Sequence, residues 1–121
     1  MCIRDSDVTD NNTLKNIYAY DIASNTYKLA GKLPHEIRAT SISQWDKYIF
    51  LTGDYNRNTF IGCFDTQTRQ FVQVKSNMLG RRFANAGIVN DLLYVYGGGL
   101  SLSDPGMAST QSADVKQLFV K

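Results

Sequence analysis

The sequence predicts an all-β protein, and three observations support this fold class. Short runs rich in Val, Ile, Tyr, Phe and Thr recur about every ten residues, with polar turn residues between them. No segment shows the i, i+3, i+4, i+7 apolar spacing of a capped amphipathic helix. The pattern also repeats after 44 residues (position 21 matches position 65), as in architectures built from repeated small sheets. We therefore expect successive antiparallel sheets.

The first repeated module is a strand that ends in an aromatic residue and an aspartate. Residues 17–21 read Ile-Tyr-Ala-Tyr-Asp, and residues 61–65 read Ile-Gly-Cys-Phe-Asp. An aromatic residue follows six positions after each aspartate, Tyr27 in the first unit and Phe71 in the second. Each unit predicts a hairpin, and we expect these aromatic side chains, with Tyr20 and Phe64, to pack between neighbouring sheets.

The turns inside these units are small and polar. Residues 23–26 and 67–70 separate the two strands of each unit. An aspartate that precedes such a turn commonly accepts hydrogen bonds from the backbone N–H groups of the turn. Asp21 and Asp65 are therefore expected to stabilise their own turns.

A second module repeats between the hairpins. Arg38 and Arg82 are 44 residues apart, and the apolar run 48–53 matches the run 93–98. The two arginines are expected at strand starts, where they would bond buried carbonyl or carboxylate groups. Asn90-Asp91 predicts a tight hairpin turn before the second run.

Glycines end both apolar runs of the second module. Gly53 ends the first run, and Gly97, Gly98 and Gly99 end the second. At the end of a strand, glycine is expected to supply a backbone conformation that a Cβ atom would forbid.

The modules together resemble the Kelch repeat: an arginine, two strands ending in glycine, a strand ending in Tyr/Phe-Asp, and an aromatic residue six positions later. The resemblance implies a galactose oxidase-like β-propeller with four-stranded blades. It covers residues 14–121 and divides them into a half blade (14–34), a full blade (35–78) and a partial blade (79–121). The expected fold is thus a partial propeller of about two blades whose ring is not closed.

The last blade is expected to end differently from the others. Residues 115–120 are predicted as its third strand, so the strand numbers become two, four and three. The preceding residues 100–113, rich in Ser, Gly and Pro, are predicted as a long loop. Five hydroxyl residues of this loop would form a recognition surface: Ser101, Ser103, Ser109, Thr110 and Ser112. The alternative is that the loop is a flexible insertion.

The N-terminal residues are treated separately. Residues 1–6 resemble a translated sequencing adapter, and residues 1–13 are expected to be artefactual or disordered. Cys63 then remains as the only cysteine, which favours a reducing compartment such as the cytoplasm.

Composition excludes several classes of function. The net charge of +2 and the scattered basic residues predict neither nucleic acid nor membrane as a partner. His35 is the single histidine and is expected in a solvated loop, while Cys63 lies on a predicted strand, so no metal site is predicted. No cofactor motif is present, since Gly97 to Gly99 lack the lysine of a phosphate-binding loop.

A second resemblance is to the sialic acid epimerases, or cyclically permuted mutarotases. It rests on Tyr20-Asp21, Asn25, Gly31-Lys32-Leu33-Pro34 and Gly53-Asp54. It implies that Asp54 transfers protons, although that family has Glu there, and that Arg57 pairs with the substrate carboxylate although it comes earlier than the family's arginine. The alternative is that residues 54–58 form a solvated polar turn.

Three functional hypotheses follow. The first is a Kelch-repeat scaffold that presents blade loops to a protein partner and packs against the remaining blades of its parent chain. The second is a mutarotase or epimerase acting on N-acetylneuraminate. The third is a structural part of a larger enzyme whose active site lies in other blades.

Overall fold

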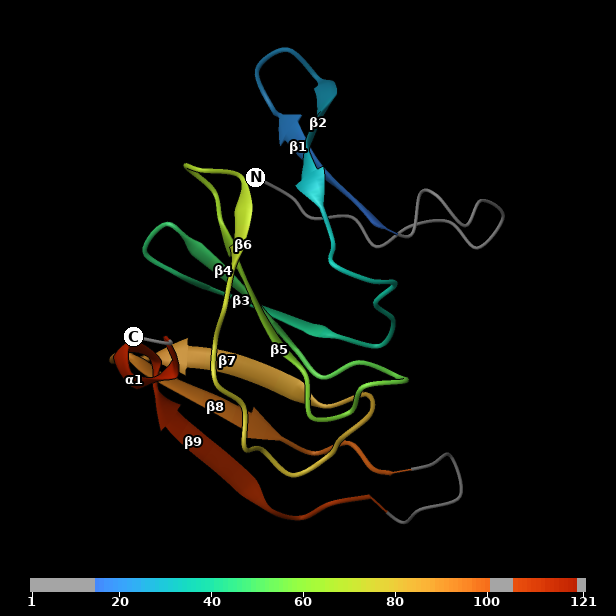
Figure 1. Ribbon diagram of the computed structural model, residues 1–121, viewed down its shortest axis with the longest axis vertical. Helices are drawn as coiled ribbons and strands as arrows, with labels where there is room; N and C mark the ends of the chain where they lie inside the picture. Colours follow the sequence, from blue (N-terminus) through green and yellow to red (C-terminus); the bar gives the residue numbers. More distant parts are fainter. Residues whose placement is uncertain (1–14, 101–105, 120–121) are drawn as a thin grey trace.

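The chain forms three antiparallel sheets that follow one another in sequence order (Figure 1). The structure is a computed structural model and describes residues 15–100 and 106–119. Within these residues the elements are β1 (Asn16–Asp21) and β2 (Thr26–Lys32) in the first sheet, β3 (Ser41–Trp45), β4 (Tyr48–Thr52), β5 (Ile61–Asp65) and β6 (Gln70–Val72) in the second, and β7 (Asn85–Val89), β8 (Leu92–Tyr96) and β9 (Thr110–Asp114) in the third, followed by α1 (Val115–Leu118). The predicted all-β class and the strand numbers two, four and three are confirmed, and none of these sheets closes on itself.

The backbone repeats with the same 44-residue offset as the sequence. Residues with positive φ recur in pairs, with φ from 51° to 75°: Asn25 with Arg69, Ala39 with Phe83, Asp46 with Asn90, and Gly53 with Gly97. Positive φ is uncommon for residues other than glycine, so four such pairs at one offset show that the units share turn geometry. Asn90 and Asp91 both have positive φ, which confirms the predicted tight hairpin turn between β7 and β8.

The second sheet is the central layer and is buried on both faces. Side chains alternate along a strand, so Phe50 and Cys63 point to one face while Leu51 and Phe64 point to the other. Phe50 and Cys63 belong to a core shared with the third sheet, including Leu93. Leu51 and Phe64 belong to a second core that the first sheet and the chain after β2 complete: Ile17 and Ala30 from the sheet, and Leu33 and Ile37 from the following segment.

The first strands of the second and third sheets lie side by side. Ala86 on β7 donates its backbone N–H to the Ser41 hydroxyl on β3, at 2.9 Å. Further along, the Trp45 indole N–H donates to the Asp91 carboxylate at 2.8 Å. These two bonds hold β7 and the turn that follows it against β3.

The aspartate turns form as predicted, and the repeated aromatic residues differ in burial. Asp21 accepts from the N–H groups of residues 23 and 24 at 2.9 and 3.3 Å, and Asp65 from those of residues 67 and 68 at 2.8 and 3.1 Å. Phe64 is fully buried. Tyr27, however, is 60% exposed, and its ring lies against that of Tyr20 in a tilted arrangement with the centroids 4.7 Å apart.

The end of the third sheet corrects two expectations. Residues 110–114 form β9, so the predicted loop 100–113 ends before Thr110; residues 101–105 of that loop lie outside the described residues. The predicted strand 115–120 is instead a single helical turn to Leu118, capped by Asp114, whose side chain accepts from Lys116 N at 2.9 Å. The turn forms because Val115 and Leu118, three residues apart, are then both buried in one core.

The predicted role of the repeated arginines is also wrong. The Arg38 guanidinium lies 3.8 Å from the half-exposed Glu36, and that of Arg82 lies over the Tyr55 ring. Their equivalence is in the backbone: the carbonyl of Arg38 accepts from Tyr55 N at 3.0 Å, and that of Arg82 accepts from Gly99 N at 3.1 Å.

The buried arginine is Arg81. Its guanidinium donates to the carbonyls of Gly97 and Ser109, at 3.1 and 2.6 Å, and its relative exposure is 0%. Gly98 is required beside it, since a Cβ there would lie 2.5 Å from the carbonyl oxygen of Arg82. The positive φ of Gly53, Gly97 and Gly98 confirms the predicted role of these three glycines, whereas Gly99 does not have positive φ.

Candidate functional site

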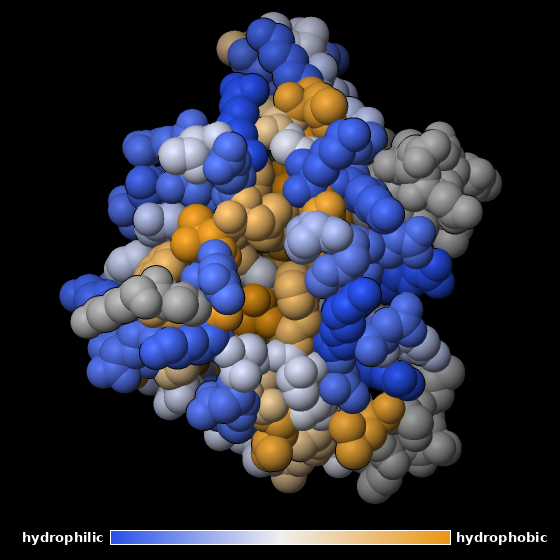
Figure 2. Space-filling model, viewed as in Figure 1, coloured by the Kyte–Doolittle hydropathy of each residue, from blue (hydrophilic) through white to orange (hydrophobic). Residues whose placement is uncertain are grey.

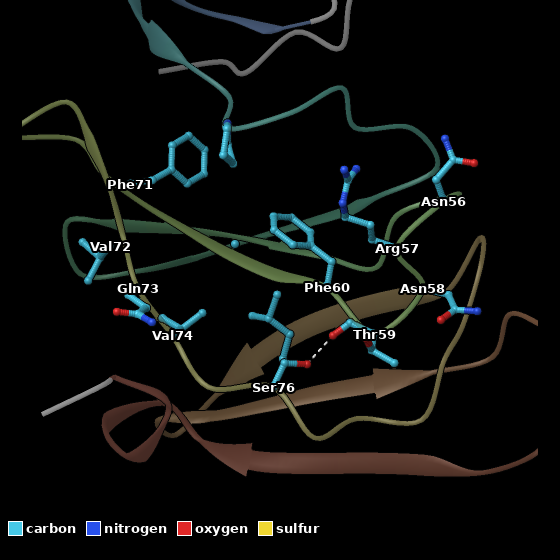
Figure 3. Close-up of a pocket in the computed structure, with 13 residues that line it drawn as sticks. Asn56, Arg57, Asn58, Thr59, Phe60, Phe71, Val72, Gln73, Val74 and Ser76 are labelled. Carbon is cyan, nitrogen blue, oxygen red and sulfur yellow. Dashed lines mark hydrogen bonds between the residues drawn. The ribbon is translucent and has the colours of Figure 1, made fainter.

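An open groove of about 760 Å³ lies where loops connect β2, β4, β5 and β6 (Figure 3). Its lining comes from the chain after β2, the segment after β4, the start of β5, and β6 with the chain that follows it: Pro34, Asn56 to Gly62, Phe71 to Val74, and Ser76. This volume is within the range of ligand-binding clefts, about 300–1,000 Å³.

The groove forms because two paired strands diverge. The pairing of β5 with β6 ends at Cys63 and Val72. The chain after Val72 turns away and makes an isolated bridge between Val74 and Phe119, and Lys75 N donates to Leu118 O at 2.6 Å. Ile61 is therefore paired with Thr52 of β4 on one side of the strand and borders the groove on the other side.

Two aromatic rings form the apolar part of this groove. Phe60 and Phe71 both belong to its lining, and Gly62 lies between β4 and the departing chain. A Cβ on Gly62 would lie 2.6 Å from the Phe60 ring, so the missing side chain lets the ring cover the strand. Figure 2 shows apolar side chains gathered in the middle of this face, over β5 and β6.

Polar side chains form the rim. Asn56, Arg57, Asn58 and Gln73 line the groove, and Figure 3 shows Arg57 extending beside the Phe60 ring. Arg57 is 55% exposed at its side chain and is the single charged residue of the lining. At the far end the Ser76 hydroxyl donates to the Thr59 carbonyl and closes the groove.

A buried carboxylate lies behind Arg57. Asp54 has a relative exposure of 0%, so the alternative of a wholly solvated turn is wrong for this residue. Its Oδ1 accepts from Arg38 N at 2.9 Å, whereas its Oδ2 has no hydrogen-bond partner among the described residues. The Arg57 guanidinium lies 3.9 Å from Oδ2 and compensates the charge that burial would otherwise make costly.

His35 completes this cluster. Its Nε2 lies 3.8 Å from Asp54 Oδ2, too long for a hydrogen bond, and its ring contacts Phe60 edge-on. Burial lowers the pKa of His35, and the charge of Arg57 lowers it further, against the opposing effect of Asp54. His35 is therefore mainly neutral at pH 7, and the charged pair of the cluster is Asp54 with Arg57.

The sequence located part of this cluster and missed the rest. Asp54 and Arg57 were singled out, and the structure brings them together. His35 was expected in a solvated loop, but the chain between β2 and β3 folds back so that its side chain is only 19% exposed. Position 35 lies 19 residues before position 54, and no periodic signal in the sequence links them.

The predicted recognition loop takes a different place. The carbonyl and hydroxyl oxygens of Ser109 accept hydrogen bonds from the guanidinium of the buried Arg81. Thr110 and Ser112 belong to β9. Ser101 and Ser103 lie outside the described residues, as do residues 1–13.

The cysteine and the acidic residues form no metal centre in the described part of the chain. No group of three or more His, Cys, Asp or Glu side chains lies close enough to hold an ion there. Burial, helped by the charge of Asp65, raises the pKa of the Cys63 thiol to about 12. In residues 15–100 and 106–119 no helix has the length and apolar character needed to cross a membrane.

Comparison of the sequence with protein-family models and with curated proteins gives no match.

Proposed function

We propose that the chain is part of a Kelch-type β-propeller that acts as a protein-interaction scaffold, and that the groove is its partner site. Support for the propeller comes from the three successive antiparallel sheets and their common 44-residue offset. In this proposal the second sheet is a complete blade, the first and third are parts of neighbouring blades, and the remaining blades of the parent chain cover their free faces.

The groove is the observation that carries the interaction proposal. It combines apolar aromatic surface from Phe60 and Phe71 with a single exposed arginine and amide side chains. Aromatic residues and arginine are enriched at protein interfaces, whereas charged residues are depleted from their centres. The groove is open along its length, which suits a chain segment better than an enclosed small molecule.

The test is selection of displayed random peptides of about twelve residues on the purified protein. We expect enriched peptides whose affinity falls at least about tenfold when Gln73→Trp fills the groove. Lys28→Glu, on the exposed face of β2, is the matched surface control and should leave the affinity unchanged. Enriched peptides that bind Gln73→Trp as well as the parent protein would place the partner site elsewhere.

A sugar-acid mutarotase or epimerase is a second candidate, favoured by the cluster of Asp54, His35 and Arg57. Asp54 Oδ2 is buried and has no hydrogen-bond partner among the described residues, so Arg57 would first have to move aside to admit the substrate. Asp54 would then take the anomeric hydroxyl proton of N-acetylneuraminate, and the resulting carboxyl would give that proton to the ring oxygen as the ring C–O bond breaks. Arg57 would bind the substrate carboxylate from the rim of the groove.

Anomer exchange of N-acetylneuraminic acid followed by NMR tests this candidate. Acceleration over buffer that is lost in Asp54→Asn, with Lys28→Glu as control, would support it. Exchange at the buffer rate with folded protein would remove it and leave the scaffold proposal unaffected.

A further inference from the structure

We propose that the groove takes its partner as an added β-strand, with the backbone of Ile61 as the point of pairing and a carboxylate of the partner on Arg57. This inference rests on the proposed interaction function and specifies the chemistry of the partner. The occupant is a short extended segment of another protein that carries an acidic side chain beside an apolar one.

The direction of the Ile61 backbone groups follows from bonds on either side of it. In an antiparallel pair, successive residues alternate between facing the partner strand and facing away. Gly53 N donates to Phe60 O at 2.8 Å, and Thr66 N donates to Lys47 O at 3.0 Å. Residues 60, 62, 64 and 66 therefore face β4, and Ile61 faces the opposite side.

On that opposite side the ladder has ended. Cys63, the next outward-facing residue, pairs with Val72, but no backbone hydrogen bond joins Ile61 to residues 73–75 among the described residues. The N–H and C=O of Ile61 thus point into the groove. A buried or half-buried peptide group without a partner is unfavourable, so a strand that supplies one donor and one acceptor here is favoured.

The ends of the groove limit the length of the added strand. On one side it meets Val72, the last residue of β6. On the other, the carbonyl of Thr59, the next outward-facing residue after Ile61, is already bound by the Ser76 hydroxyl. At about 3.3 Å per residue, the space between suits roughly three residues in extended conformation.

The side chains of the groove set the preferred sequence. A residue flanking the paired position would place an apolar side chain on Phe60 and Phe71. Arg57 is the one charged group of the lining; its guanidinium has five donors, and its contact with Asp54 at 3.9 Å leaves donors for a second carboxylate. A bidentate arginine–carboxylate bond would orient the segment.

Amide hydrogen exchange of two neighbouring residues provides the sharpest test. In the free protein we expect the Ile61 amide to exchange at least about tenfold faster than the Gly62 amide, whose N–H faces β4. Saturation with an enriched peptide should slow Ile61 exchange at least about tenfold and leave Gly62 unchanged. Equal protection of Ile61 and Gly62 in the free protein, or no change at Ile61 on binding, would overturn the inference.

Charge reversal tests the second half of the inference. Arg57→Glu is expected to weaken an enriched acidic peptide at least about tenfold and Arg57→Lys less, with Lys28→Glu again as control. Protection of Gly62 reports that each variant is folded. N-methylation of a peptide removes the backbone N–H donors that strand addition needs. If peptides bind in the groove and neither Arg57→Glu nor N-methylation of their backbone weakens binding, the scaffold proposal stands and the strand-addition inference is wrong. If no peptide is enriched, both fail.

Discussion

The hairpins β1–β2 and β5–β6 share a sequence pattern and a turn but occupy different environments. In both, an aspartate accepts from the backbone N–H groups two and three positions later. The residues four positions after these aspartates, Asn25 and Arg69, have positive φ. Yet Asp65 is 4% exposed and pairs with Lys47 at 3.2 Å, whereas Asp21 is exposed. The difference arises because β5 has β4 as a second neighbour, whereas β1 pairs with β2 alone among residues 15–100 and 106–119.

The comparison separates what a local pattern determines from what neighbouring strands determine. The turn needs only its own residues, so it forms in both places. Burial of the aromatic residue before the aspartate needs strands on both sides: Phe64 is 0% exposed, while the equivalent Tyr20 is partly exposed. Four experiments would test this separation.

The largest expected effect comes from removing the buried ring. Phe64→Ala should lower the free energy of unfolding by about 3–5 kcal/mol, because the ring fills the core between the first and second sheets. Tyr20→Ala, at the equivalent position, should cost about 1 kcal/mol. Urea unfolding of both variants measures this, and similar losses would show that the two hairpins are equally buried.

A matched pair of thiols should react at different rates. Cys63 is buried with a pKa raised to about 12, so its thiolate is scarce at neutral pH. Ala19 is the equivalent position on β1 and is partly exposed. In a Cys2→Ser background, we expect Ala19→Cys (with Cys63→Ala) to react with a disulfide reagent at least about tenfold faster than Cys63. Equal rates would mean that β5 opens as easily as β1.

Asp65 should contribute to acid stability. Burial acts to raise the pKa of Asp65, but the N–H groups of Thr68 and Gln67 and the Lys47 ammonium outweigh it and hold the pKa below the usual 3.8. A folded-state pKa below the unfolded value means that the contribution of Asp65 is complete above about pH 4 and is lost as pH falls through the folded pKa.

Asp65→Asn should therefore lower the melting temperature at pH 7 and flatten its decline on acidification. At pH 7 the exposed Asp21→Asn should lower the melting temperature less. Part of the acid sensitivity will remain, since the Trp45 indole N–H and Lys116 also lower the pKa of Asp91. If the melting temperature of Asp65→Asn fell with decreasing pH as steeply as that of the parent protein, the assigned role of this carboxylate would be wrong.

The smallest effect is expected at the exposed ring of the first hairpin. Tyr27→Phe should change the free energy of unfolding by less than about 0.5 kcal/mol, because the side chain is 60% exposed. A loss above about 1 kcal/mol in chemical denaturation would indicate that a further part of the molecule covers it.

The sequence predicted those elements whose signal is local. The Tyr/Phe-Asp strands, the aspartate turns and the glycines of positive φ each need only a few adjacent residues to be recognised. β9 was missed because its residues, Thr-Gln-Ser-Ala-Asp, lack the apolar alternation of a strand. It forms as an edge strand because β8 supplies the partner for pairing.

The candidate site was less predictable because it depends on the path of loops. Arg81 and Arg82 are adjacent arginines, and only the fold decides which one turns inward. His35 reaches Asp54 through a connection that has no sequence repeat behind it. The groove itself depends on the chain leaving β5 after Val72, which is set by a bridge to Phe119 almost fifty residues later (119 against 72).

That bridge joins the outer edge of the middle sheet to the helical turn after the last strand. Val74 and Lys75 are held by Phe119 and Leu118, and the same turn buries Val115 and Leu118 in the core that contains Phe50 and Cys63. Loosening α1 would thus free the chain after β6 to continue along β5 and fill the groove with its own backbone.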